Sequence, residues 1–179
     1  MKIKVWSGIL RKDAEIFWGL ATVSLVAGLA LNQARDIPLP LVYISKQARM
    51  EQMISRLVTG QSIASSDRPQ PIALEELADL VKEGKGIVLD ARPEIFYRQG
   101  HVPGALSLSR EEFERDYRRQ RSVLEKDWGQ LLAVYCADSI CDDGQLVADA
   151  LSKLGFRRVL LFKGGWNEWR EQRLPEEKL

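Results

Sequence analysis

Three short apolar runs in the C-terminal part of the chain have the pattern of buried strands. They are GIVLDAR at 86–92, LLAVYC at 131–136 and RRVLLF at 157–162. Each run is continuously apolar and has a length that is typical of strands rather than of helices. The sequence therefore predicts three strands in the interior of a sheet.

Two amphipathic segments accompany these runs. One covers 73–84 and the other 142–155, and each repeats apolar residues at helical spacing and ends on a glycine. Asp142 or Asp143 is positioned to cap the second helix. Strands that are separated by helices of this length predict an α/β fold, a parallel sheet with helices on both faces.

The N-terminal segment contains an uncharged stretch from Ile16 to Gln33. Its length is about the minimum that a helix needs to cross a bilayer. We therefore expect residues 1–15 to be a basic flank and residues 16–33 to be a single transmembrane helix, a signal anchor. Two alternatives stay open: a cleaved signal peptide, with the small residues Gly28 and Ala30 before a cut after Ala30, and a buried core helix.

Basic residues lie on both sides of this stretch. Those before it are Lys2, Lys4, Arg11 and Lys12, and those after it are Arg35, Lys46 and Arg49. The small excess before the stretch favours an N-terminus on the inside. This predicts a single-pass membrane protein whose C-terminal domain lies on the non-cytoplasmic, periplasmic side.

Residues 34–71 join this segment to the domain. Within them, 45–60 carries apolar residues at helical spacing, namely Met50, Met53, Ile54, Leu57 and Val58. This spacing predicts a juxtamembrane amphipathic helix whose apolar face meets lipid, the domain or another subunit. The small, polar and proline residues of 59–71 then indicate a linker, so the domain is expected to cover 72–179.

Composition limits the classes of function. The 179 residues include 26 basic and 25 acidic side chains, for a net charge of +1, which leaves no electrostatic footprint for nucleic acid. Two cysteines are too few for a disulfide scaffold, and a single histidine leaves no cluster with zinc spacing. We therefore expect no metal, no other cofactor and no nucleic acid partner.

Cys136 follows the apolar run at 131–136 and precedes the helix at 142–155 by a short loop. In parallel α/β folds, sites lie at the carboxyl ends of the strands. A helix N-terminus at this place favours a thiolate over a thiol, which would make Cys136 nucleophilic. The alternative is an inert buried cysteine that ends a strand.

Three stretches together resemble the rhodanese family of sulfurtransferases. VLDARPEIFYRQGHVPGAL is similar to the family's Asp-x-Arg element and its Gly-His-x-Pro-Gly-Ala turn. VYCADSICDDGQLVADALSKLGF resembles its active-site strand, loop and helix, and VLLFKGGWNEW resembles its closing strand and Gly-Gly-x-x-x-Trp turn. The resemblance covers roughly 72–174 and implies a rhodanese-like domain behind the membrane helix.

The resemblance implies that Cys136 accepts sulfur as a persulfide. The active-site loop would then be Ala137, Asp138, Ser139, Ile140 and Cys141. Asp90 and Arg92 match the supporting Asp-x-Arg pair, and a structural ion pair is the interpretation we favour for them. His101 matches a structural turn, so a general-base role is the less favoured interpretation for the only histidine. A small sulfur donor and a thiol acceptor are the implied partners, and a protein partner stays open.

The loop departs from the family pattern in its charge. Loops that use thiosulfate carry cations, whereas this one has Asp138 inside it and two more aspartates after Cys141. Carboxylates near a dianion raise its energy, so we expect thiosulfate to be a poor donor. Cys141 is either a resolving thiol in a redox pair with Cys136 or a small apolar residue.

Three functions are therefore compared. The first is a membrane-anchored rhodanese-like sulfurtransferase that uses Cys136. The second is a non-catalytic rhodanese-like binding module, which the acidic loop favours. The third is a thiol redox protein that uses Cys136 and Cys141.

Overall fold

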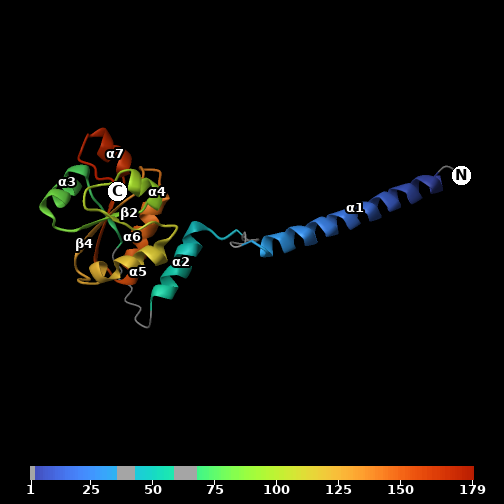
Figure 1. Ribbon diagram of the computed structural model, residues 1–179, viewed down its shortest axis with the longest axis horizontal. Helices are drawn as coiled ribbons and strands as arrows, with labels where there is room; N and C mark the ends of the chain where they lie inside the picture. The colour runs from blue at the N-terminus through green and yellow to red at the C-terminus, as the bar shows by residue number, and fades with distance from the viewer. Residues whose placement is uncertain (1–2, 36–42, 59–67) are drawn as a thin grey trace. The chain divides into compact units, whose positions relative to one another are not determined.

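The computed structural model describes residues 3–35, 43–58 and 68–179, which form two compact units, Met1–Ile44 and Ser45–Leu179 (Figure 1). The first unit contains one helix, α1 (Ile3–Gln33). Its stretch Asp13–Gln33 has a mean hydropathy of 1.7 and is long and apolar enough to span a membrane. None of this stretch is buried, which argues against the core helix and leaves the anchor and the signal peptide open.

The second unit is built on a five-stranded parallel sheet. The strands are β1 (Gln70–Pro71), β2 (Ile87–Asp90), β3 (Leu106–Ser107), β4 (Leu131–Tyr135) and β5 (Arg158–Phe162). They lie in the order β1-β5-β4-β2-β3. The three predicted strands are thus confirmed as the centre of the sheet, and two strands of two residues each form its edges.

Helices cover both faces of this sheet, as the sequence predicts. They are α2 (Lys46–Leu57), α3 (Leu74–Glu83), α4 (Glu94–Gln99), α5 (Phe113–Leu124), α6 (Asp142–Leu154) and α7 (Gly165–Glu171). Side chains of β4 alternate: Leu132 and Val134 join a core with α2, α5 and α6, whereas Ala133 and Tyr135 join a core with α3 and α7. A period of two along a strand produces this two-sided core.

The start of α6 differs from the prediction. Cys141 is the N-cap residue, and neither Asp142 nor Asp143 caps the helix, because both already lie in its first turn. The carboxylate of Asp143 forms ion pairs instead, with Arg110 and Lys46. The helix ends as predicted at Gly155, which adopts a left-handed conformation.

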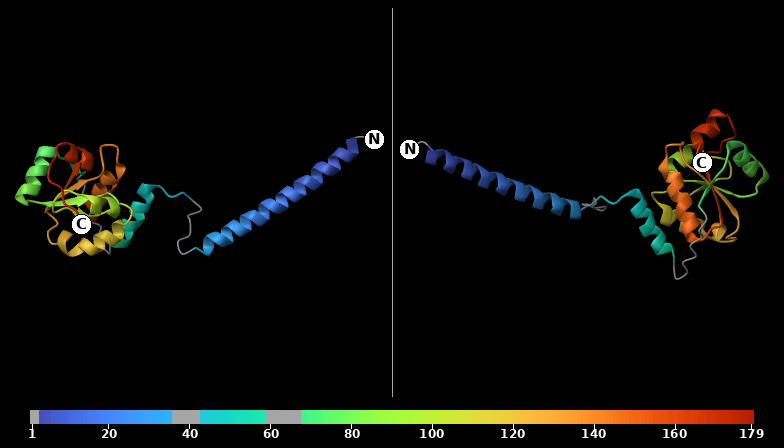
Figure 2. Two further views of the ribbon diagram at one scale, coloured as in Figure 1. Left: turned by 45° about the horizontal axis from the view of Figure 1, so that its top comes forward. Right: turned by 180° about the vertical axis from the view of Figure 1, so that it is seen from behind.

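The amphipathic helix α2 packs on the domain. Its apolar face contributes Met50 and Ile54 to the core with α5 and α6, and it lies beside these two helices in both further views (Figure 2). Lys46 and Glu51 form ion pairs with Asp143 and Lys153 of α6. Of the surfaces left open by the sequence, the domain is the one that the apolar face of α2 contacts, and the compact unit begins at Ser45.

This packing predicts that the substitution Met50→Ala destabilises the second unit by about 2–5 kcal/mol, since it removes a side chain that is 3% exposed. Urea unfolding of the full chain in detergent would measure the change. Gln47→Ala, an exposed position on the same helix, is the control. Equal stability of the two variants would show that α2 does not belong to the cooperative unit.

Candidate active site

Cys136 directly follows β4 and lies at the carboxyl edge of the sheet, as predicted. It is buried, with 4% of the residue exposed. The chain then forms the loop from Ala137 to Cys141 and enters α6. Gly144 in the first turn of α6 lies close to Cys136: a Cβ added to Gly144 would lie 3.2 Å from the Cβ of Cys136. The amino-terminal turn of the helix therefore packs against Cys136.

The start of α7 holds the backbone of Cys136 in place. The N–H of Trp166 donates to the carbonyl of Cys136 at 2.8 Å, and the N–H of Asn167 donates to the carbonyl of Ala137 at 2.9 Å. Gly165, which precedes them, has a φ of +66°, and an added Cβ would lie 2.7 Å from backbone atoms of Cys136 and Ala137. Only glycine allows this approach.

Cys136 and Cys141 are joined by a disulfide, with a Cα–Cα distance of 6.1 Å. This distance is within the range that disulfides require. The loop between them is closed by Asp138, whose carbonyl accepts from the N–H of Cys141 at 3.2 Å. Its carboxylate accepts from the N–H of Ile140 at 3.2 Å and from the side-chain amide of Asn167 at 3.4 Å.

A buried ion pair supports the site from the neighbouring strand. Asp90 ends β2, and its Oδ2 accepts from Nη2 of Arg92 at 2.6 Å and from the hydroxyl of Tyr135 at 2.6 Å. Arg92 also donates to the carbonyl of Gly100 at 2.7 Å, and its guanidinium carbon lies 4.8 Å from the ring centroid of Trp166. This arrangement matches the structural ion pair that the sequence analysis favours.

Burial and the charge of Asp90 hold the pKa of Tyr135 well above its ordinary value. Burial is the larger cause, and the hydrogen bond that the hydroxyl donates to Asp90 acts in the same direction. Tyr135 therefore stays a hydrogen-bond donor, and its oxygen also accepts from the N–H of Val102 at 3.2 Å.

A hollow of about 500 Å³ opens beside the two cysteines. Arg92, Trp166 and Cys136 line it, and Phe96 of α4 adds an apolar side chain. Its other lining residues include the cations Arg170 and Lys178 and the carboxylate Glu176, which lies within 4.0 Å of both cations. The hollow therefore has room for a small sulfur compound next to the disulfide.

One of the three aspartates near the loop, Asp143, is paired with two cations. Asp143 Oδ1 lies 2.9 Å from Nε of the buried Arg110 and 3.0 Å from Nζ of Lys46. Asp138 uses its carboxylate within the loop, as described above. The expected repulsion of a dianion thus concerns mainly the exposed Asp142 and the partly buried Asp138.

His101 lies in a structural turn and is 1% exposed. Its Nδ1 is 2.8 Å from the carbonyl of Tyr97, and its ring stacks on that of Tyr97 at 3.8 Å. Its backbone pairs with Glu177 in an isolated bridge. Because His101 does not line the hollow beside Cys136, the geometry agrees with the structural interpretation.

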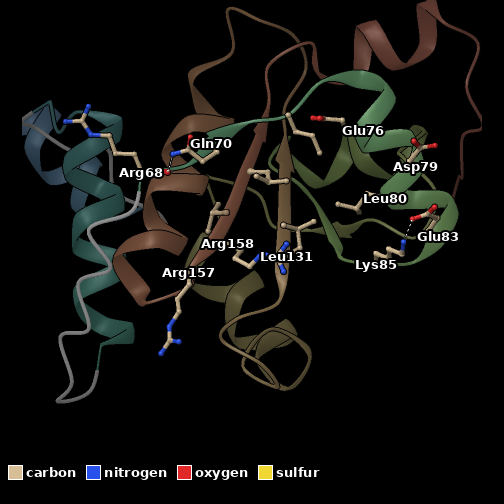
Figure 3. Close-up of a pocket in the computed structure, with 13 residues that line it drawn as sticks. Arg68, Gln70, Glu76, Asp79, Leu80, Glu83, Lys85, Leu131, Arg157 and Arg158 are labelled. Atoms are coloured by element: carbon tan, nitrogen blue, oxygen red, sulfur yellow. Dashed lines mark hydrogen bonds and ion pairs between the residues drawn. The ribbon is translucent and has the colours of Figure 1, made fainter.

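A larger hollow, of about 750 Å³, lies at the opposite end of the sheet (Figure 3). It lies by the amino ends of β4 and β5, where Leu131 and Arg158 begin these strands. Figure 3 shows the pair of Glu83 and Lys85 beside it, with a distance of 2.7 Å between the charged atoms. Neither cysteine nor histidine lines this hollow. Within the residues that the structure describes, no group of three His, Cys, Asp or Glu side chains could hold a metal ion.

Several residues around the cysteines escape sequence reasoning. Arg110 follows β3 and pairs with Asp143, and Phe96, Arg170 and Lys178 line the hollow. The position of Arg110 just beyond an edge strand would place it near the cysteine loop only if β3 were known. A strand of two residues, such as β3, cannot be predicted from the sequence. The other three belong to segments whose spacing indicates nothing about the cysteine loop.

The substitution Tyr135→Phe is expected to lower the free energy of unfolding by about 1–3 kcal/mol, because Asp90 loses a buried donor. Above about pH 10, the ordinary pKa of tyrosine, the unfolded chain ionises at this position while the folded chain keeps its proton. The wild type therefore loses stability with rising pH, and the variant loses less. Urea unfolding near neutral and alkaline pH would test this, with the exposed Tyr43→Phe as control. An identical alkaline loss in all three proteins would contradict it.

Comparison with known proteins agrees with this architecture. The model of the rhodanese-like domain family matches residues 73–172. A mitochondrial protein of Schizosaccharomyces pombe, named as a candidate thiosulfate sulfurtransferase, is 26% identical over 137 residues, which are 66% of this chain and 92% of that protein.

Solved structures show the same fold. The solution structure of a rhodanese-like domain from Anabaena sp. is 25% identical and has a TM-score of 0.52, covering 63% of this chain and 81% of that one. A Bacillus halodurans protein of 20% identity has a TM-score of 0.53, covering 75% and 87%. Since the family model matches more than half of the chain, this protein belongs to the rhodanese family.

Proposed function

We propose that this protein is a sulfurtransferase that carries sulfane sulfur as a persulfide on Cys136. The observation that carries the proposal is the position of Cys136, which ends β4, packs against the first turn of α6 and lines the hollow of about 500 Å³. A helix N-terminus stabilises a thiolate and, in the same way, an anionic persulfide. The relative from Schizosaccharomyces pombe supports sulfur transfer as the type of reaction.

In the reaction, the Cys136 thiolate attacks the sulfane sulfur of a donor. A bond forms between this sulfur and Sγ, and the donor leaves with the electron pair of the broken bond, as sulfite if the donor is thiosulfate. A thiol acceptor then attacks the outer sulfur and releases the Cys136 thiolate. The ion pairs of Asp143 with Arg110 and Lys46 reduce the negative charge that an anionic donor meets.

The expected product is a persulfide on Cys136, which makes the Cys141→Ser chain heavier by one sulfur atom. Intact mass spectrometry of the reduced full chain in detergent, after exposure to thiosulfate, mercaptopyruvate or polysulfide, would detect it. Cys136→Ser should abolish the adduct, and Cys141→Ser should retain it. A folded Cys141→Ser variant that forms no adduct with any donor would reject sulfur transfer and favour the non-catalytic binding module.

The disulfide between Cys136 and Cys141 favours a second candidate, a thiol redox protein. Such a protein would lose two thiols under mild oxidation and regain both with a reductant. Titration of thiols through one such cycle is the test. Thiols that persist in the presence of a mild oxidant would remove this candidate.

We also propose that α1 is a retained anchor that keeps the domain at a membrane. The apolar stretch Asp13–Gln33 supports it by length and hydropathy. The expectation that the domain lies on the periplasmic side remains part of this proposal.

The full chain should therefore remain in membranes after alkaline carbonate extraction, and its N-terminus should be intact by mass. A cleaved signal peptide would instead yield a soluble chain that begins at Leu31. Fusion of a periplasm-dependent reporter after Leu179, compared with a cytoplasm-dependent one, would test the side. Activity of only the cytoplasmic reporter would overturn the proposed orientation.

A further inference from the structure

The two cysteines of the site differ in accessibility although they share one disulfide. Cys136 is buried, whereas Cys141 is partly exposed, and both line the hollow of about 500 Å³. The four residues between them bring the Cα atoms to 6.1 Å. A thiol at position 141 can therefore reach Sγ of Cys136.

Asp138 gives the loop the shape that makes this contact. Its backbone carbonyl accepts from the N–H of Cys141, and its carboxylate accepts from the N–H of Ile140 and the amide of Asn167. The backbone of Cys136 is held separately, by the start of α7. One side of the disulfide thus lies on a fixed strand end and the other on a turn that Asp138 closes.

A purely stabilising role explains this disulfide poorly. A cross-link stabilises a fold mainly through the length of the loop that it closes, and the sequence separation here is only five. The backbone of the loop already has hydrogen bonds at both ends. A role in chemistry accounts better for a second cysteine within reach of the first.

We propose that Cys141 resolves the Cys136 persulfide and releases its outer sulfur as hydrosulfide, which gives the site a second activity, the reduction of sulfane sulfur. This inference rests on the proposed persulfide. The Cys141 thiolate attacks the inner sulfur, Sγ of Cys136. The Sγ–Sγ bond forms, the bond to the outer sulfur breaks, and this sulfur leaves as hydrosulfide with the electron pair of that bond. The two cysteines supply the two electrons and become a disulfide.

An external dithiol completes the cycle. Its first thiolate attacks the more accessible sulfur, that of Cys141, and forms a mixed disulfide while Cys136 leaves as a thiolate. The first turn of α6 packs against Cys136 and stabilises the thiolate that leaves. The second thiol of the reductant then releases Cys141. In sum, a dithiol and a sulfane sulfur become a disulfide and hydrosulfide.

The test uses the reduced full chain in detergent, with no thiol present, and thiosulfate or mercaptopyruvate as donor. These donors leave sulfite or pyruvate, so any hydrosulfide comes from the persulfide. The wild type is expected to release about one hydrosulfide per chain and to end two hydrogens lighter, without both thiols. Cys141→Ser should stay one sulfur heavier and release hydrosulfide at least about tenfold more slowly.

The outcomes separate this inference from the proposed function. A stable persulfide on the wild type, with Cys141 still a thiol and no hydrosulfide, would overturn the inference and leave sulfur transfer intact. If neither the wild type nor Cys141→Ser gains sulfur from these donors or from polysulfide, the proposed function fails and the inference fails with it.

Asp138 provides a finer test as a positioning residue. In Asp138→Ala, the ratio of the hydrosulfide release rate to the loading rate is expected to fall about tenfold, because the loop before Cys141 loses the bonds of the Asp138 carboxylate to Ile140 and Asn167. Asp138→Asn keeps an acceptor oxygen and should restore the ratio. Asp142→Ala removes an equal charge next to Cys141 and serves as the matched control. A ratio for Asp138→Ala equal to that of the wild type would show that Asp138 does not position Cys141, and an equal fall in Asp138→Ala and Asp142→Ala would show that it acts only through its charge.

Discussion

The buried ion pair of Asp90 and Arg92 connects β2 with β4, with α7 and with the turn after α4, all of which lie near the cysteine loop. The side chain of Arg92 is 6% exposed and that of Asp90 is fully buried, so each charge needs its partner. Through Tyr135 the pair joins β2 to β4, through the carbonyl of Gly100 it joins the turn after α4, and through Trp166 it joins α7. β4 and α7 hold the backbone of Cys136. The position of this cysteine therefore depends on two charged side chains that form no hydrogen bond with it.

The central strands and the helices α3 and α6 were predictable because their apolar residues repeat with the period of their structure. The edge strands β1 and β3 have two residues each, too few for any period. Helix α5 is also hard to predict, since its core residues Phe113, Tyr117 and Leu124 lie among many charged ones. Helix α5 is therefore stabilised by tertiary packing rather than indicated by a local pattern of apolar residues.

The candidate site was predictable for its main cysteine and only partly for its surroundings. A cysteine between a strand and a helix has a position that topology dictates. The ion pair of Asp143 and Lys46 joins residues that are 97 positions apart in the sequence, so no local pattern could predict it. For the same reason, the sequence alone does not show that Asp143, one of the three aspartates near the loop, is paired with cations. It also left the pairing of Cys136 and Cys141 open, because the Cα distance depends on the turn at Asp138.

Two backbone hydrogen bonds from α7 hold the end of β4, whereas among the described residues no contact of this kind holds the rest of the cysteine loop. Because Trp166 and Asn167 bind the carbonyls of Cys136 and Ala137, opening the disulfide would leave this strand end held and would affect the segment from Asp138 to Cys141. This segment includes Ile140, which is 86% exposed. The oxidised and reduced forms would then share most of their surface and differ around one exposed apolar side chain.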